Sequence, residues 1–166
     1  MHLSEHMTLG EVTKTSTGMT NIPSRVNIEN LKRVCFWLEA LRARYNQRYV
    51  VSGVRGHGGS VVREYSKCRE EAEEPIVITS GFRSPEVNRA VGGSSTSNHL
   101  TGCAVDIRVA GIEQALRYAV ILMDYADETR QDYDELLIER NKAGRYWLHF
   151  AVRPKENRRK TMIIQK

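Results

Sequence analysis

Residues 97–109 read SNHLTGCAVDIRV, a polar turn followed by an apolar strand that is interrupted by Asp106. His99 lies in the turn, seven residues before Asp106. A carboxylate is costly to bury among apolar residues unless it is paired or bound to a metal. The stretch therefore predicts a β-strand that carries a cation ligand.

A second apolar strand also contains one polar interruption. Residues 146–152 read YWLHFAV. Strand alternation places Trp147 and His149 on one face and Tyr146 on the other. A lone strand histidine is more often a hydrogen-bonded core residue than a ligand, so His149 by itself decides nothing.

Together, these residues have the composition of a catalytic zinc site. Such sites use three protein ligands, usually His, Asp or Glu, and leave the fourth position to water. His99, Asp106 and His149 would supply two imidazoles and one carboxylate. Spacing alone leaves a metal site and ordinary core residues about equally open.

The rest of the chain alternates helical and strand patterns. Asn27 is placed to cap a long amphipathic helix, Ser84 and Pro85 begin a second helix, and Thr8 and Glu11 can form a capping box. The expected elements are a helix from 27 to about 45, a strand at 76–79, a helix from 84 to 92, a strand at 103–109, a helix at 111–125, and a strand pair at 135–139 and 146–152. This order predicts an α+β fold, with a mainly antiparallel sheet flanked by helices.

Length and composition indicate a single globular domain over residues 1–166. The chain is 40% hydrophobic and 27% charged, and it contains no apolar run of the roughly 20 residues that cross a bilayer. Residues 46–74, which contain four glycines, a basic part and an acidic part, form a long excursion ending in a short polar helix. Disorder at its glycines and a functional loop are equally open.

The remaining sequence features concern the redox state of the cysteines, export and possible partners. Cys35, Cys68 and Cys103 are too scattered for a disulfide framework, so we expect reduced thiols. The N-terminus lacks a basic start and an apolar run, which predicts no secretory leader. The net charge of +5 suggests an anionic partner without identifying it. We expect the basic tail, residues 158–160, to be a solvated end.

The motifs resemble those of the zinc D-alanyl-D-alanine carboxypeptidase family. They are Ser97-x-His99-x-x-Gly102-x-Ala104-x-Asp106, the preceding Ser80-Gly81-Phe82-Arg83-Ser84 and the following Trp147-Leu148-His149. That family includes carboxypeptidases, dipeptidases and phage endolysins, and the wider group extends to hedgehog signalling domains. The resemblance implies a hedgehog- and DD-peptidase-like fold, Zn²⁺ bound by His99, Asp106 and His149, and a peptidoglycan peptide as substrate.

The resemblance also suggests roles for residues around the metal. Arg83 would contact the substrate or the polarised carbonyl, with a salt bridge to Glu86 as the structural alternative. Ser97 would bind substrate, although an ordinary turn hydroxyl is nearly as plausible. Trp147 is either a substrate platform or a core residue.

The general base is where this chain departs from the pattern. Many members carry an acid three positions before the last histidine ligand, and here that position is Tyr146. Glu139 is the best replacement, because a three-residue hairpin loop at 143–145 would pair it with His149 on the same face. Related members also place a glutamate on this strand. A two-residue loop would turn Glu139 away.

These observations lead to a zinc metallopeptidase that acts on cell-wall stem peptides, either as a carboxypeptidase or as an endopeptidase. A zinc-retaining, non-catalytic module of the hedgehog type is the alternative, and a nucleic-acid-binding domain is the least supported. We expect a monomer without a membrane span, cytoplasmic until release by lysis or associated with a phage.

Overall fold

A five-stranded sheet organises the molecule. The computed structural model describes residues 1–47, 49–57, 60–67 and 73–166, with the segments 49–57 and 60–67 described by their backbone. The strand order is β3-β4-β6-β5-β7, antiparallel throughout except for the parallel pair β5 and β7. The strands are β3 (Ile78–Ser80), β4 (Ala104–Arg108), β5 (Glu135–Arg140), β6 (Tyr146–Ala151) and β7 (Lys160–Gln165). The predicted α+β class with a mainly antiparallel sheet is confirmed.

Capping side chains confirm two of the predicted helix starts, and a third lies earlier than predicted. They are α1 (Leu9–Thr13), α2 (Arg25–Asn46), α3 (Pro85–Ala90), the 3-10 helix η1 (Asn98–Thr101) and α4 (Ile112–Thr129). Thr8 and Glu11 form the expected capping box, and Ser84 caps α3. The start of α2 was predicted too late: Ser24 is its N-cap, and Asn27 is the third helical residue that completes the box.

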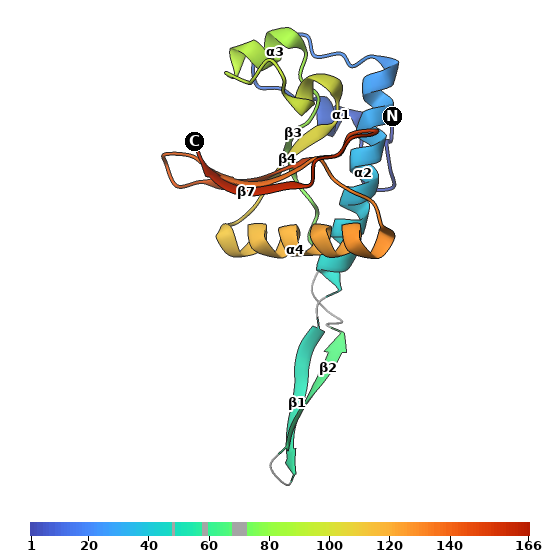
Figure 1. Cartoon of the computed structure of the whole chain (residues 1–166), viewed down its shortest axis with the longest axis vertical. Helices are drawn as coiled ribbons and strands as arrows, with labels where there is room; N and C mark the ends of the chain where they lie inside the picture. The colour runs from blue at the N-terminus through green and yellow to red at the C-terminus, as the bar shows by residue number, and fades with distance from the viewer. Residues whose placement is uncertain (48, 58–59, 68–72) are drawn as a thin grey trace.

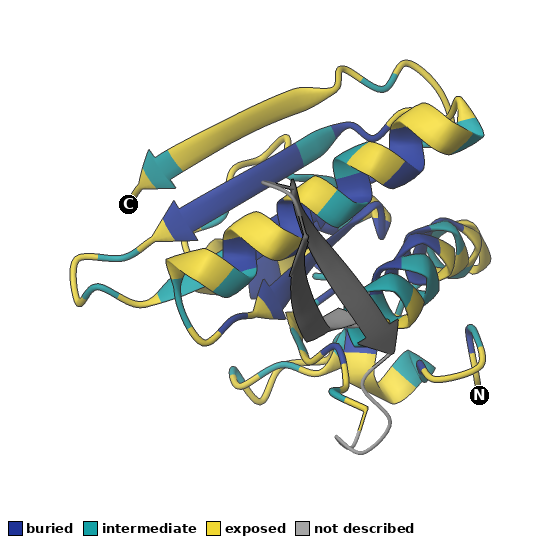
Figure 2. Cartoon of the chain, turned by 90° about the horizontal axis from the view of Figure 1, so that it is seen from below, coloured by how far each residue is buried: buried dark blue, intermediate teal, exposed yellow. Residues whose placement is uncertain are grey.

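Helices α2 and α4 cover one face of the sheet, where the hydrophobic core lies (Figures 1 and 2). Alternate residues of β4, β5 and β6 point into this core. Trp37 of α2 is at its centre, with ring centroids 4.9 Å from Tyr125 and 5.5 Å from Phe150. The strand residues that point to the opposite face are therefore free to build a site.

The excursion after α2 contains a β-hairpin. Strands β1 (Tyr49–His57) and β2 (Ser60–Lys67) pair antiparallel and extend away from the end of α2 (Figure 1). The sequence pattern missed these strands because Gly53 and Gly56 interrupt the residues typical of a strand. The short polar helix expected at the end of the excursion falls mainly outside the described residues.

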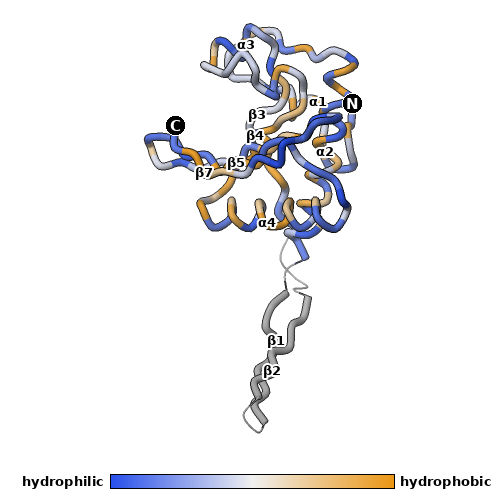
Figure 3. Tube along the Cα trace, viewed as in Figure 1, coloured by the Kyte–Doolittle hydropathy of each residue, from blue (hydrophilic) through white to orange (hydrophobic). Residues whose placement is uncertain are grey.

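The sequence suggested that the basic tail, residues 158–160, is a solvated end. The structure contradicts this expectation, because the tail leads into a strand of the sheet. The hydrophilic segment after β6 (Figure 3) leads into β7, the exposed edge strand that pairs with β5 (Figure 2). The amide of Lys160 donates to the carbonyl of Asp134 at 3.0 Å. An edge strand can be held by such main-chain bonds without apolar alternation, so hydrophobic periodicity did not reveal it.

Two further expectations concern the chain as a whole. No helix in the described parts of the chain is long and apolar enough to span a membrane. Cys35 and Cys103 are free and buried, as predicted, and Cys68 lies outside the described residues.

Candidate metal centre

A cavity of about 660 Å³ lies on the polar face of the sheet, opposite α4. It collects side chains from β4, β5, β6 and β7 together with the turn that contains η1. Every site residue predicted from the sequence lines it: Arg83, Ser97, His99, Asp106, Glu139, Trp147 and His149.

His99 is held by the turn that the sequence singled out. The hydroxyl of Ser97 accepts the His99 amide at 3.3 Å, and Gly102 ends η1 with a φ of 71°. The Nδ1–H of the buried ring donates to the carbonyl of Gly81 at 2.6 Å. In a neutral ring, this bond keeps the proton on Nδ1 and leaves Nε2, the nitrogen that faces Asp106, as the one that can bind a metal.

Asp106 lies at the centre of the group, directly across from His149 in the pairing of β4 and β6. Its Oδ1 is 3.3 Å from Nε2 of His99 and 2.9 Å from Nδ1 of His149. Burial alone would raise the pKa of Asp106, but the charges and hydrogen bonds of His99 and His149 hold it well below its usual range. The carboxylate is therefore ionised.

His149 lies between two carboxylates. Nδ1 faces Asp106, and Nε2 is 3.5 Å from Oε2 of Glu135. Burial lowers the pKa of His149, yet the hydrogen bond to Asp106 and the nearby carboxylate of Glu135 outweigh that effect and raise it to about 9. Without a metal, the ring carries a proton that balances the surrounding negative charge.

The three residues fit a metal ion. One ligand atom from each of His99, Asp106 and His149 lies within 4.8 Å of the others, and all three residues are buried. Two imidazoles and one carboxylate are a donor set typical of catalytic zinc. The hydrogen bond from His99 to the Gly81 carbonyl already orients the His99 ring, as the hydrogen-bond partner of a metal-binding histidine usually does.

The register of β5 and β6 differs from the one expected. Glu139 pairs with Trp147, and Leu137 pairs with His149, because the hairpin loop spans the five residues 141–145. The displacement is two residues, so Glu139 keeps the face predicted for it. It is 3% exposed, lines the cavity and accepts a hydrogen bond from Lys166 Nζ at 2.7 Å.

Arg83 does not form the alternative salt bridge to Glu86, which pairs with Arg89. Its NH2 donates to Oδ2 of Asp106 at 2.6 Å, and its Nε donates to Ser80 at 2.8 Å. Arg83 therefore holds the outer oxygen of Asp106, while the other oxygen faces the two histidines.

Tyr146 lies on the other face of β6, where it packs against the core. In a regular strand, a residue three positions before His149 points away from the metal. The absence of an acid at Tyr146 thus removes nothing from this cavity. His6 does not line this cavity, and its Nδ1 lies 2.9 Å from Oε2 of Glu39.

Sequence reasoning missed Glu135, which shares the cavity with the predicted residues. The nearby His149 ring lowers the pKa of Glu135 to about 2, although burial opposes the shift. The signal was present, because Glu135 and Glu139 are four residues apart on one strand and therefore share a face.

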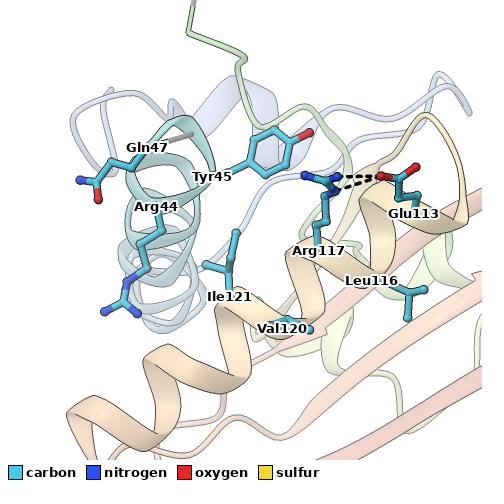
Figure 4. A pocket seen from close by; sticks show the side chains of 8 residues that line it. All are labelled: Arg44, Tyr45, Gln47, Glu113, Leu116, Arg117, Val120 and Ile121. Carbon is cyan, nitrogen blue, oxygen red and sulfur yellow. Dashed lines mark hydrogen bonds and ion pairs between the residues drawn. The ribbon is translucent and has the colours of Figure 1, made fainter. Parts of the chain in front are cut away.

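A smaller pocket of about 440 Å³ lies away from this centre, between the end of α2 and α4 (Figure 4). Its lining mixes Leu116 and Val120 with the ion pair of Arg117 and Glu113 at 2.7 Å. It contains none of the three predicted metal ligands. The three candidate ligands line the larger cavity instead.

Comparison with known proteins agrees with this geometry. A family model described as peptidase M15 matches residues 59–126, a segment that contains His99 and Asp106, whereas His149 lies beyond it. No curated protein matches the chain significantly. The family match confirms the resemblance that the sequence shows to the M15 zinc peptidases, a family that includes D-alanyl-D-alanine carboxypeptidases and endolysins.

Proposed function

We propose that the protein is a zinc-dependent peptidase that hydrolyses the stem peptides of peptidoglycan, as a D-alanyl-D-alanine carboxypeptidase or an endopeptidase. The observation that carries this proposal is the buried cluster of His99, Asp106 and His149, which lines a cavity that Glu139 also lines. A zinc ion held by these three residues would lower the pKa of water to about 7 and polarise the scissile carbonyl.

Glu139 is the proposed general base. A carboxylate in this position can take a proton from the attacking water and pass it to the leaving amine. Its burial on the ligand face of β5 supports this role. The bond from Lys166 fixes the carboxylate and is compatible with proton transfer, because a carboxylate accepts several hydrogen bonds at once.

The remaining residues would bind the peptide. Arg83 uses two of its donors on Ser80 and Asp106, and a guanidinium has five. Its other donors can reach a substrate carboxylate or the carbonyl of the scissile bond. The Ser97 hydroxyl, which accepts the His99 amide, keeps its own proton for a substrate oxygen. Trp147 offers an aromatic wall, with Lys166 Nζ 5.5 Å from its ring centre.

Digestion of defined muropeptides tests the proposal. The protein, loaded with zinc, is incubated with pentapeptide and cross-linked fragments, and the products are identified by mass. We expect cleavage that stops when a chelator is added and returns with zinc. Release of a terminal D-alanine indicates a carboxypeptidase, and internal fragments indicate an endopeptidase. If zinc binds but no fragment is cleaved, the hedgehog-like binding module replaces the enzyme.

A further inference from the structure

Glu135 approaches the side of His149 that faces away from the other ligands. His149 presents Nδ1 to Asp106 at 2.9 Å, whereas Nε2 is 3.5 Å from Oε2 of Glu135. The latter distance is roughly 0.3 Å beyond the ordinary limit of about 3.2 Å for an N–H···O bond. The two carboxylates thus bracket the ring, one at each nitrogen.

Glu135 is itself held in place. Nδ2 of Asn98 donates to its Oε2 at 3.0 Å, and NH2 of Arg158 is 3.0 Å from its Oε1. Lys160 Nζ lies 3.6 Å from the same Oε1. The carboxylate is thereby fixed at both oxygens, with Oε2 directed at His149.

The holding residues are anchored by the neighbouring Asp134, whose side chain is fully buried. Asn98 donates to it at 2.8 Å, and Arg158 donates through Nε at 2.8 Å and NH2 at 2.6 Å. Asn98 and Arg158 therefore each bridge Asp134 and Glu135. Such a network, once satisfied, is rigid.

We propose that Glu135 is a positioning residue for the metal centre, which turns the His149 ring so that Nδ1 faces the metal, and that Asn98 and Arg158 hold it there. The proposal rests on the metal site of the proposed function. A metal-binding histidine usually donates its second N–H to a carboxylate or carbonyl, and losing that partner typically costs 10–100-fold in metal affinity. Gly81 serves His99 in this way, and Glu135 serves His149.

The role differs from that of Glu139. Glu135 approaches His149 at Nε2, the nitrogen that does not face Asp106. Glu139 pairs with Trp147 and accepts a hydrogen bond from Lys166. Removal of Glu135 should therefore change metal affinity, and removal of Glu139 should change turnover. Zinc affinity is the readout that separates these roles.

The test measures zinc affinity by competition with a chelator for the full chain and for Glu135→Ala, Glu135→Gln and Glu39→Ala. Glu39 is the matched control, because it also pairs with a histidine, His6, and is partly buried. We expect a loss of about 10–100-fold for Glu135→Ala. Glu135→Gln should recover part of this loss, because its side-chain carbonyl can accept the same N–H. Glu39→Ala should keep the parent affinity.

Cobalt loading adds a spectroscopic readout. The visible absorption of bound Co²⁺ should change in Glu135→Ala and return toward the parent spectrum in Glu135→Gln. Folded Glu135→Ala with parent affinity and spectrum would overturn the proposal. If that variant does not fold, Asn98→Ala takes its place, since it frees one side of Glu135. Parent affinity in Asn98→Ala would equally overturn the proposal.

The outcomes keep this proposal and the function apart. A parent protein that cleaves muropeptides while Glu135→Ala keeps full zinc affinity rejects only the positioning role. A parent that cleaves nothing but loses zinc affinity with Glu135→Ala rejects only the peptidase. Failure of the parent to bind zinc rejects both.

Discussion

Zinc binding should depend steeply on pH, because the metal must displace a proton from His149. In the metal-free protein, the pKa of His149 is about 9. Burial lowers this pKa, but Asp106 and Glu135 raise it by more than burial lowers it. Below this pKa, the deprotonated fraction falls tenfold with each pH unit, and only that form binds zinc. Apparent zinc affinity should fall roughly 100-fold between pH 8 and pH 6. A histidine with an ordinary pKa of about 6.5 would give only about fourfold.

The same pKa shift makes the stability of the metal-free protein depend on pH in the direction opposite to zinc affinity. A histidine whose pKa is raised on folding stabilises the folded state below its unfolded pKa of about 6.5. That contribution is lost as pH rises through about 9. The metal-free protein should therefore lose stability from pH 7 to pH 10 through this group, while zinc affinity increases over the lower part of the same range.

Competition titrations at pH 6, 7 and 8 measure the affinity, after correction for protonation of the chelator. Calorimetry in two buffers with different ionisation heats should show about one proton released for each zinc bound at pH 7. A change of fourfold or less between pH 8 and pH 6, with no proton release, would refute the raised pKa.

Three further variants test the fold and the site. Trp37→Ala should lower the free energy of unfolding by about 3–5 kcal/mol in urea denaturation, because Trp37 is 1% exposed in the aromatic core; a loss below about 1 kcal/mol would contradict this packing. Gly81→Ala should lower both stability and zinc content, since the added Cβ would lie 2.2 Å from the carbonyl oxygen of Val12. The control Gly10→Ala has room for its Cβ and should keep both. Normal zinc content in Gly81→Ala would refute the role of this close approach. Replacing residues 53–59 with a short linker should leave zinc content unchanged in metal analysis, because the three ligands come from other elements; loss of zinc would mean that a ligand is misplaced.

The candidate ligands stand out in the sequence because Asp106 and His149 interrupt apolar strands and His99 lies in a polar turn just before one of them. Asp106 and His149 are isolated polar residues in apolar strands, and their faces follow from strand alternation. Their pairing across β4 and β6 needed the structure. Local pattern fixes which face a residue occupies, and tertiary pairing fixes which residues meet.

Glu139 shows how far strand alternation alone can predict the position of a residue. Its face depends only on the parity of the register, so a two-residue error in the loop left the face correct and moved the partner from His149 to Trp147. The loop is longer than expected because Asn141 Oδ1 accepts the Arg145 amide at 2.9 Å and Gly144 adopts a φ of 81°. Side-chain turn bonds of this kind are not visible as periodicity.

The C-terminal contribution to the site could not be predicted from local pattern. Strand β7 is exposed, and it joins the sheet through parallel pairing with β5, in which each residue of β5 faces the residue 25 positions later. It brings Lys160 and Lys166 to the cavity, next to Arg158 from the segment before it. Their partners are the buried Glu139 and the half-buried Glu135, and carboxylates removed from water in this way need cationic partners.

The most direct test of the account is the zinc content and muropeptide turnover of Glu139→Gln beside the parent. Glutamine keeps the size and one accepting oxygen of the side chain but cannot take a proton. Tyr146→Phe is the control, and it should behave as the parent because Tyr146 packs against the core. We predict parent zinc content in Glu139→Gln with turnover reduced about 10²–10⁴-fold, the usual contribution of a general base. Cleavage at the parent rate with full zinc would contradict the mechanism.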